Sequence, residues 1–251
     1  MDIGWSVTSD TLDLFYDIPE NLVSKVRKEY LKFNKVQGDI SKCLGVQDLW
    51  GSVYELKFPF DIRFKYNKES RQVIVDDKFT NIDLTKLNEL ISCTESNFTN
   101  KNPVIRLLLR MFFVSDKPCT LTIIPPIFEL EKNPMWSKIR LVSARMNIHS
   151  WQRDVNFGFE LLDKDAEITI RKGEVISYIM FNSENLDEKF NIKKVEFKGK
   201  LKEHYDLVNN SRSMISSGTR YLLGKALGRR PKKLVHEKGK CPYGFDKLKF
   251  W

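Results

Sequence analysis

The residues best suited to metal chemistry lie near the carboxyl end of the chain. His204 and Asp206 are two residues apart, and a further histidine follows at His236. A His-x-Asp pair with a distal histidine is the ligand set of non-haem iron oxygenases, which use jelly-roll cores. In those enzymes the pair sits on or beside a core strand, whereas here it lies in a segment with helical spacing. The pattern therefore favours a solvated helix face over an iron site.

Zinc is a second possibility, because His236 and Cys241 are five residues apart and both types bind it. A structural zinc ion usually has four protein ligands, so Cys43, Cys93 or Cys119 would have to be brought in by folding. The sequence holds no C-x-x-C pair, and we expect reduced thiols rather than disulfides. We therefore predict no metal and no cofactor.

The segment HSWQRD places His149, Trp151 and Arg153 between two apolar strands. A histidine at the end of a strand is more often a hydrogen-bonded structural residue than a site residue. By the same interpretation Trp151 caps the core, and Arg153 pairs with Asp154 or with a backbone carbonyl group. The alternative is that His149, Trp151 and Arg153 line a pocket. No glycine-rich phosphate loop or nucleophile motif accompanies them, so an enzyme is less favoured than a binding protein.

The chain carries a net charge of +9, and the distribution of this charge matters more than its size. Between residues 220 and 251 ten Lys or Arg residues face two acidic ones, which leaves residues 1–219 nearly neutral. Such a basic arm can attract nucleic acid or an acidic protein surface. Its aromatic rings can stack on bases or dock into an apolar groove, and we favour docking against protein. The residues expected to bind the partner are Arg229, Arg230, Lys232, Lys233, Lys238, Lys240, Tyr243, Phe245 and Trp251.

The elements that must position these groups are mainly strands. Between residues 56 and 66 apolar residues alternate with polar ones and Pro59, which indicates a strand with one buried face. Proline cannot donate to a ladder, so Pro59 marks an edge, a bulge or a break there. The turn NKES leads to a returning strand at RQVIVDD. Strand-like segments then continue from residue 104 to residue 197, with IRLVSARMNIHSW as one segment. Gly173 is expected to turn the chain in a left-handed conformation between two of them.

Helical spacing is found at residues 19–33, NIDLTKLNELI, LKEHYDLVNNSRSMI and GTRYLLGKALG. Together these patterns predict a mainly β, α+β chain. Its antiparallel β-sandwich or jelly-roll-like core would carry flanking helices and a basic C-terminal arm. The expected divisions are an N-terminal strand and helix extension over residues 1–45, a β-rich core over 46–198, and a helical segment with the arm over 199–251.

The composition is that of a globular protein, with 41% hydrophobic and 30% charged residues. The longest apolar runs, LLLRMFFV and LTIIPPIF, are far shorter than the roughly 20 residues that span a bilayer. The first residues show neither a basic nor an apolar signal region, so we expect no secretion signal and no membrane partner.

Five segments between residues 43 and 245 carry a resemblance: CLGVQDLWGSVYELKFPFDIRF, IIPPIFE, MNIHSWQRDVNFGFEL, ITIRKGEVISYIMF and KCPYGF. Their most specific steps are Trp151 to Arg153, Lys172 to Glu174, and the terminal C-P-aromatic-G-F. Together they resemble an uncharacterised family of β-rich proteins found in bacteria and, in a longer form, in tailed phages of marine cyanobacteria. The resemblance implies a phage or phage-like setting, in the cytoplasm of an infected bacterium or in a virion. It supplies no activity, cofactor or site residue.

The favoured hypothesis is a phage-encoded, non-catalytic binding or assembly protein whose β-sandwich core and basic arm contact a protein partner. One alternative is a cupin-like metal-dependent oxygenase that uses His149, His204 or His236. The other is a nucleic-acid-binding protein that acts through residues 220–251. An exposed apolar patch would favour assembly, and a steep salt dependence would favour nucleic acid.

Overall fold

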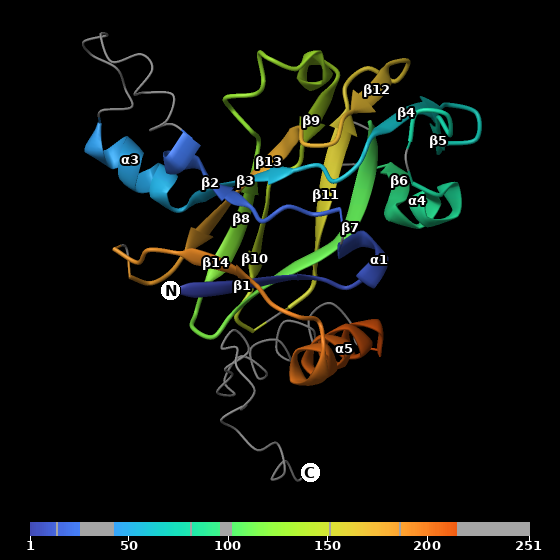
Figure 1. The fold of residues 1–251 in the computed structure, drawn as a ribbon. Coiled ribbons are helices and arrows are strands. Elements are labelled where there is room, and N and C mark those ends of the chain that lie inside the picture. The colour runs from blue at the N-terminus through green and yellow to red at the C-terminus, as the bar shows by residue number, and fades with distance from the viewer. Residues whose placement is uncertain are drawn as a thin grey trace.

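The computed structural model describes residues 1–13, 15–25, 43–80, 82–95, 102–150, 152–185 and 187–214. These residues form a mainly β protein in which three sheets share one apolar core (Figure 1). The mainly β, sandwich-like fold predicted from the alternating segments is confirmed. The basic arm over residues 220–251 lies outside the described residues, as does most of the helix predicted over residues 19–33.

The largest sheet is built around β7, a strand of 13 residues. β7 pairs antiparallel with β1, β6 and β11, and β14 pairs in parallel with β1. The six strands are β1 Asp2–Val7, β6 Ile91–Glu95, β7 Pro103–Ser115, β9 Ile139–Leu141, β11 Asp154–Leu161 and β14 Asn191–Lys194. Because β1 lies between β7 and β14, the first residues of the chain belong to this sheet. The division at residues 45 and 198 stays a prediction.

The second sheet is antiparallel, with the strand order β10-β8-β13-β3-β2. Its strands are β2 Glu20–Asn21, β3 Val53–Lys57, β8 Thr120–Ile124, β10 Ala144–Asn147 and β13 Val175–Asn182. A third sheet contains β4 Ile62–Asn67, β5 Gln72–Val75 and β12 Glu167–Ile170. The pairing of β4 with β5 confirms the predicted return of the chain after NKES.

The alternating segment at residues 56–66 serves two sheets. Leu56, Phe58, Phe60 and Phe64 are all buried, although β3 pairs with β13 and β4 pairs with β12 and β5. Pro59 lies between the two strands, as its missing N–H group predicts. The period of two therefore continues through a corner, so that one run of sequence lines the core from two sheets.

The helices are short, apart from the last one. They are α1 Asp10–Asp13, α3 Leu44–Gly51, α4 Leu84–Leu90, α5 Gly199–Met214 and the 3-10 helix η3 Pro134–Ser137. α4 and α5 lie in segments whose spacing predicted helices. α5 is amphipathic, because Leu201 and Val208 are buried while Glu203 is exposed. Within the described residues, none of the helices has the length and apolar character that crossing a membrane requires.

The core consists mainly of aromatic and branched side chains from both large sheets. Trp5 of β1, Phe157 and Phe159 of β11, and Phe181 of β13 are at most 1% exposed and belong to one cluster. Burial of one such side chain stabilises the folded state by about 1.5–3 kcal/mol. The apolar stripes of the two sheets therefore supply the main reason for them to pack face to face.

Two predicted elements were wrong in detail. IRLVSARMNIHSW forms two strands rather than one, because β9 pairs with β11 whereas β10 pairs with β8 in the other sheet. Ile91, expected at the end of a helix, begins β6, and Cys93 in that strand pairs with Ile105 of β7. A short apolar run fits either type of element, and only the neighbouring strand decides between them.

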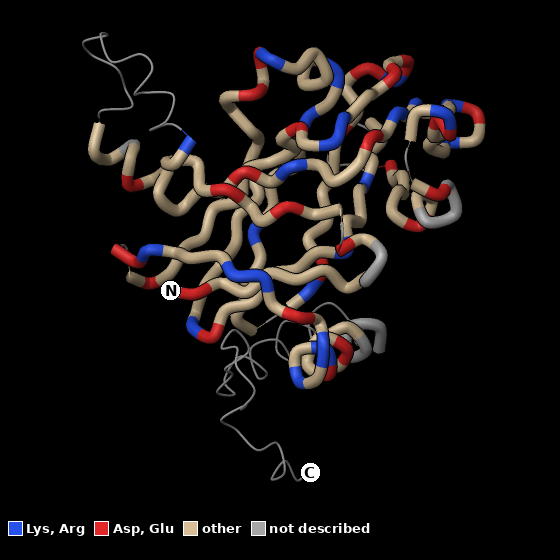
Figure 2. The backbone as a smooth tube through the Cα atoms, in the orientation of Figure 1, with Lys and Arg blue, Asp and Glu red and all other residues tan. Residues whose placement is uncertain are grey.

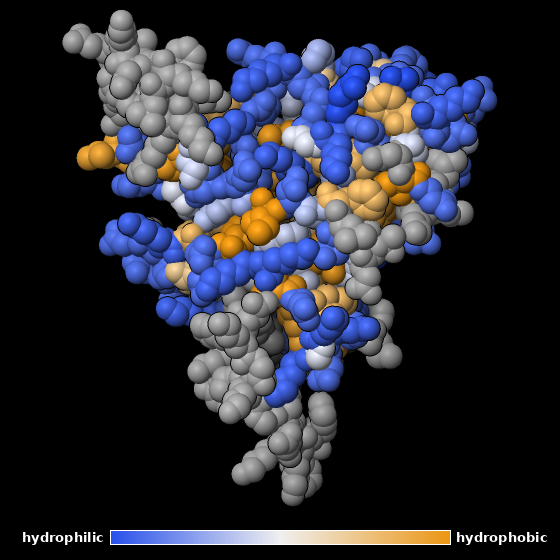
Figure 3. All heavy atoms as spheres, viewed as in Figure 1, coloured by the Kyte–Doolittle hydropathy of each residue, from blue (hydrophilic) through white to orange (hydrophobic). Residues whose placement is uncertain are grey.

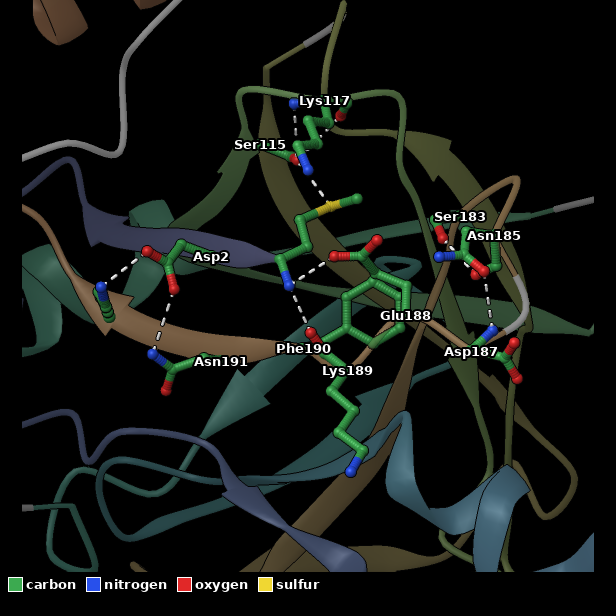
Figure 4. A network of polar contacts seen from close by, with 12 residues as sticks. Asp2, Ser115, Lys117, Ser183, Asn185, Asp187, Glu188, Lys189, Phe190 and Asn191 are labelled. Atoms are coloured by element: carbon green, nitrogen blue, oxygen red, sulfur yellow. Dashed lines mark hydrogen bonds and ion pairs between the residues drawn. The ribbon is translucent and has the colours of Figure 1, made fainter.

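Charged contacts fix the edge where β14 pairs with β1 (Figure 4). The Met1 ammonium group lies 2.7 Å from Glu188 Oε1, and Lys193 Nζ lies 2.7 Å from Asp2 Oδ2. Asn191 Nδ2 donates to Asp2 Oδ1 at 3.2 Å. The Lys193 hydrogen bond lowers the pKa of Asp2, and the ammonium group lowers the pKa of Glu188. The edge is thus held by ionised carboxylates at neutral pH.

Candidate functional site

Two segments that stood out in the sequence meet in the structure. α5 carries His204 and Tyr205, and the connection from β10 to β11 leads through Gln152 to Asp154. His204 Nε2 lies 2.5 Å from Gln152 Oε1, and the Tyr205 hydroxyl donates to Asp154 Oδ1 at 2.6 Å. We call these four side chains the α5 joint, because they connect the helix to the large sheet.

The hydrogen bonds of Gln152 determine where His204 holds a proton. Gln152 is fully buried, and its Nε2 donates to the carbonyl oxygens of Ile148 at 3.1 Å and His149 at 2.7 Å. The amide oxygen therefore faces His204 and can only accept, so His204 Nε2 is the donor. The prediction of a solvated helix face was wrong for His204, which is 9% exposed.

Asp154 connects the joint to an irregular point in the central strand. Arg110 Nη1 lies 3.8 Å from Asp154 Oδ2, and Arg110 has a φ of 56°, in the left-handed region. The pairing of β11 with β7 shifts its register between Asp154 and Asn156. The Arg110 carbonyl oxygen accepts from Thr8 N at 2.8 Å. A bulge in the ladder therefore accompanies the charge pair.

The side chains of the α5 joint make contacts that attach α5 to the large sheet. Burial, reinforced by the negative charge of Asp154, raises the pKa of the Tyr205 hydroxyl above its usual range. Burial likewise raises the pKa of Tyr16, whose hydroxyl donates to the Leu109 carbonyl oxygen. The Tyr205 ring also packs on Phe112, with ring centroids 5.0 Å apart. These contacts hold α5 on the sheet.

Three residues of HSWQRD were predicted as possible pocket residues. His149 and Arg153 are half-buried, and Trp151 lies outside the described residues. His149 Nδ1 lies 3.0 Å from the Ser115 carbonyl oxygen, and its backbone N–H donates to Asn147 Oδ1 at 2.9 Å. These contacts support the structural interpretation of His149. Neither His149 nor Arg153 is among the residues that line the pocket described next.

A pocket of about 600 Å³ lies where β2 and β3 meet the chain after β8 and the turn before β13. We call it the Lys25 pocket. Its volume is in the range of small-ligand sites. Figure 2 shows acidic and basic positions side by side where β2 runs beside β3. The charged residues that line the pocket are Glu20, Glu55, Glu129, Glu174, Lys25, Lys57 and Lys132.

Lys25 joins two glutamates in this pocket. Its Nζ lies 2.7 Å from Glu55 Oε1 and 3.2 Å from Glu129 Oε1. The Glu55 side chain is 2% exposed, whereas the Lys25 side chain is 34% exposed. Burial acts to lower the pKa of Lys25, but the two glutamates outweigh it and raise that pKa overall. Lys25 therefore stays charged and compensates a buried carboxylate.

Glu174 is held on another part of the pocket wall by neutral donors. Its Oε2 accepts from Asn133 Nδ2 at 3.1 Å and from the Arg171 backbone N–H at 3.0 Å. Gly173 has a φ of 84°, and its N–H donates to the Phe58 carbonyl oxygen at 2.8 Å. The left-handed turn predicted at Gly173 is confirmed, and it places Glu174 at the pocket.

This pocket was not predicted from the sequence, because its charged residues come from distant segments. Glu55, Glu129 and Glu174 belong to three different segments among those that carry the family resemblance. One local signal was available. Glu55 stands between Tyr54 and Leu56 in a strand, and a carboxylate in such an apolar run requires a cationic partner when the strand is buried.

The metal hypotheses gain no ligand set from the described part of the chain. Within those ranges, no group of three or more His, Cys, Asp or Glu side chains is arranged to hold a metal ion. Cys43, Cys93 and Cys119 are free thiols, and burial raises the pKa of Cys119 to about 12. His236 and Cys241 lie outside the described residues.

The nine arm residues predicted to bind a partner also lie outside the described residues, so that assignment stays a prediction. They are Arg229, Arg230, Lys232, Lys233, Lys238, Lys240, Tyr243, Phe245 and Trp251. No protein-family model matches the chain, and no characterised protein matches its sequence. The resemblance to an uncharacterised β-rich family, with the phage setting it implies, likewise stays a prediction.

Proposed function

We propose that this protein is a non-catalytic binding or assembly protein that contacts a protein partner or a second copy of itself. The observation that carries this proposal is a set of exposed apolar side chains on α3 and on the chain after β8, two segments that meet at the Trp50–Phe128 ring contact. We call it the apolar rim, and it consists of Leu44, Leu49, Ile127, Phe128 and Leu130. Each of these residues is more than a third exposed.

The apolar rim joins two segments that are far apart in the sequence. The Trp50 ring of α3 meets the Phe128 ring at a centroid distance of 5.1 Å and a nearly perpendicular angle. Half of the ten large hydrophobic residues found exposed in the described part of the chain belong to this rim. Figure 3 shows hydrophobic side chains at the surface over α3. Gathered apolar groups of this kind support protein contact.

The oxygenase hypothesis is less well supported by the contacts of the candidate ligands. His204 is buried, and its Nε2 donates to Gln152 rather than facing an open pocket. His149 Nδ1 lies against a backbone carbonyl oxygen. His204 Nε2 and His149 Nδ1 thus each contact a group of the protein itself.

The basic arm would add electrostatic attraction to the contact. Eight of the nine net positive charges belong to residues 220–251, so this segment would steer an acidic partner surface toward the protein. Nucleic acid is the alternative partner, because phosphates attract the same charges. A phage-encoded protein acting in the cytoplasm of an infected bacterium, or in a virion, fits the family resemblance.

Sedimentation velocity and capture with the tagged full-length chain test this proposal. The variant Leu49→Ser/Ile127→Ser removes two side chains of the apolar rim. The matched control is Val142→Ser/Leu162→Ser, which removes two apolar side chains elsewhere that are 42% and 45% exposed, against 53% and 54% for Leu49 and Ile127. We expect self-association, or capture of a defined protein, to be lost in the rim variant and kept in the control. Equal behaviour of both variants and the wild type would overturn the proposal.

Titration with labelled single- and double-stranded nucleic acid at two salt concentrations separates the alternative partner. The full-length variant with Gln at Arg229, Arg230, Lys232 and Lys233 is measured beside the wild type. Binding that falls steeply with salt and is lost in this variant would favour nucleic acid over protein. We expect no such binding at physiological salt.

A further inference from the structure

The charges that the described residues contribute to the Lys25 pocket do not balance. Four glutamates and three lysines among them line it, so this part of the lining has one more negative than positive charge. An open pocket of about 600 Å³ with an excess carboxylate differs from an ordinary surface ion pair, because its walls leave room for a ligand group.

Each lysine of the pocket already has a carboxylate partner. Lys57 Nζ lies 3.1 Å from Glu20 Oε2, and Lys132 Nζ lies 3.3 Å from Glu129 Oε1. Lys25 Nζ bridges Glu55 and Glu129. Three lysines and three glutamates are therefore mutually compensated, and the excess charge belongs to the fourth glutamate.

Glu174 is that fourth glutamate. Its two donors are the side-chain amide of Asn133 and the backbone N–H of Arg171, and both of them bind Oε2 and are neutral. Across the ranges that the structure describes, no lysine, arginine or histidine forms an ion pair with Glu174. These two hydrogen bonds orient the carboxylate without neutralising it, so it can accept a charged donor.

We propose that the Lys25 pocket binds an organic cation, an ammonium or guanidinium group, with Glu174 as its carboxylate partner. This inference rests on the proposed function, and under that function the cation is a Lys or Arg side chain of the protein partner. The apolar rim begins beside the pocket, since Phe128 and Leu130 flank Glu129 in the sequence. A basic side chain in the pocket with apolar neighbours on the rim would use both surfaces at once.

The pocket favours a cation over other ligands on physical grounds. Among the described lining residues, an anion would meet a net negative charge, and each of the three lysines there is paired to a glutamate. A hard divalent metal ion requires several oxygen ligands, and two of the four carboxylates are bridged by Lys25. An alkylammonium or guanidinium group needs one oriented carboxylate and a polar surround, which Glu174 and the neighbouring Asn133 provide.

The test uses the full-length chain and blocked single-residue probes. N-acetyl-lysine methylamide and its arginine counterpart are titrated at low ionic strength and followed by NMR chemical shifts. N-acetyl-norleucine methylamide has a lysine-like carbon chain without the charge. We expect the two cationic probes to bind and the norleucine probe to bind at least tenfold more weakly. Added salt should weaken the binding of the cationic probes.

The diagnostic variant is Glu174→Gln, which removes the charge but keeps an oxygen to accept the bonds from Asn133 and Arg171. Its control is Glu196→Gln, at a highly exposed glutamate paired with Lys198 just before α5. We expect Glu174→Gln to weaken the cationic probes about tenfold and the control to leave them unchanged. Equal binding by wild type and Glu174→Gln, equal binding of lysine and norleucine probes, or no binding of any probe would each overturn the inference.

Failure of this inference can be told apart from failure of the proposed function. If the rim variant loses association and no probe binds to the wild type, the proposed protein contact is supported and the proposed cation site is overturned. Butylamine is titrated in the same way, to test whether a free small amine rather than a lysine side chain is the ligand of the pocket. If butylamine binds at least as tightly as the lysine probe, the pocket serves a small amine, and the assignment of a partner side chain is overturned.

Discussion

The α5 joint and the Lys25 pocket use similar polar groups in opposite ways. In the joint, Gln152 is fully buried and saturates both of its amide atoms with protein partners. In the pocket, Glu174 accepts hydrogen bonds from two neutral donors and has no ion-pair partner among the described residues. The polar side chains of the joint hydrogen-bond to one another and to the backbone, whereas the Glu174 carboxylate of the pocket can still accept a bond from a ligand.

This difference separates residues that hold the fold from residues that can bind. A histidine beside a carboxylate in the sequence suggested catalysis, yet His204 and Tyr205 are engaged in attaching α5 to the sheet. The glutamates of the pocket were not predicted as site residues, yet they line accessible volume. Substitutions should therefore lower stability in the joint and ligand affinity in the pocket.

The largest stability effect is expected at the aromatic base of the α5 joint. Phe112 is fully buried and contacts the rings of Tyr205 and Phe197. Phe112→Ala should lower the free energy of unfolding by about 3–5 kcal/mol, because it creates a cavity under the helix. Urea unfolding followed by circular dichroism measures this change. Glu174→Gln is the comparison, and we expect it to cost less than about 0.5 kcal/mol. Similar losses in the two variants would break the contrast.

A smaller loss is expected from the polar part of the joint. Gln152→Ala should cost about 1–3 kcal/mol, because it removes the acceptor of the His204 Nε2–H group and the side-chain donor to two backbone carbonyl oxygens. A double-mutant cycle with His204→Ala isolates the coupling between the two side chains. Strictly additive losses would show that their 2.5 Å contact contributes nothing.

The dependence of stability on alkaline pH tests the role of Tyr205 in the α5 joint. The folded-state pKa of Tyr205 lies above its ordinary value of 10.0, because of burial and, to a smaller extent, the negative charge of Asp154. The protonated hydroxyl therefore contributes stability that is fully present below pH 10 and lost as the pH rises further. Tyr205→Phe should cost about 1–2 kcal/mol at pH 7 and reduce the alkaline slope by at most about 1.4 kcal/mol per pH unit. Denaturation midpoints between pH 8 and 11 measure both. An unchanged slope would place the alkaline sensitivity elsewhere, for example at Tyr16.

The smallest effects are expected from the lysines of the pocket. Lys25→Gln should cost about 1 kcal/mol, because Glu55 is buried and loses its ionic partner, although Gln can still donate to it. Lys57→Gln should cost less than about 0.5 kcal/mol, because its partner Glu20 is 64% exposed. Thermal unfolding of the two variants at neutral pH compares them. A larger loss for Lys57→Gln than for Lys25→Gln would contradict the burial argument.

Local patterns predicted much of the fold correctly. The alternation from Leu56 to Tyr66 indicated one buried face, and all six apolar positions of that run are buried. Helical spacing placed α4 and α5, and Pro59 and Gly173 marked a corner and a turn. Each of these signals depends on a few adjacent residues, so the sequence alone is enough to show it.

Long-range placement was where the predictions failed. Whether IRLVSARMNIHSW is one strand or two depends on β8 and β11, which lie before and after it in the chain. The state of His204 depends on Gln152, 52 residues away, and the burial of Glu55 depends on its partners Lys25 and Glu129. No local window contains both partners of such a contact.

The sequence by itself determined a mainly β fold, the period of its strands, a helix in LKEHYDLVNNSRSMI and a concentration of positive charge after residue 220. These follow from composition and from spacing along the chain. Only the tertiary structure decided that His204 would attach a helix to the sheet. It also decided that Glu174 would line a pocket with no ion-pair partner among the described residues. The physical reason is that burial and charge compensation depend on which atoms meet after folding, and here they come from segments far apart in the sequence.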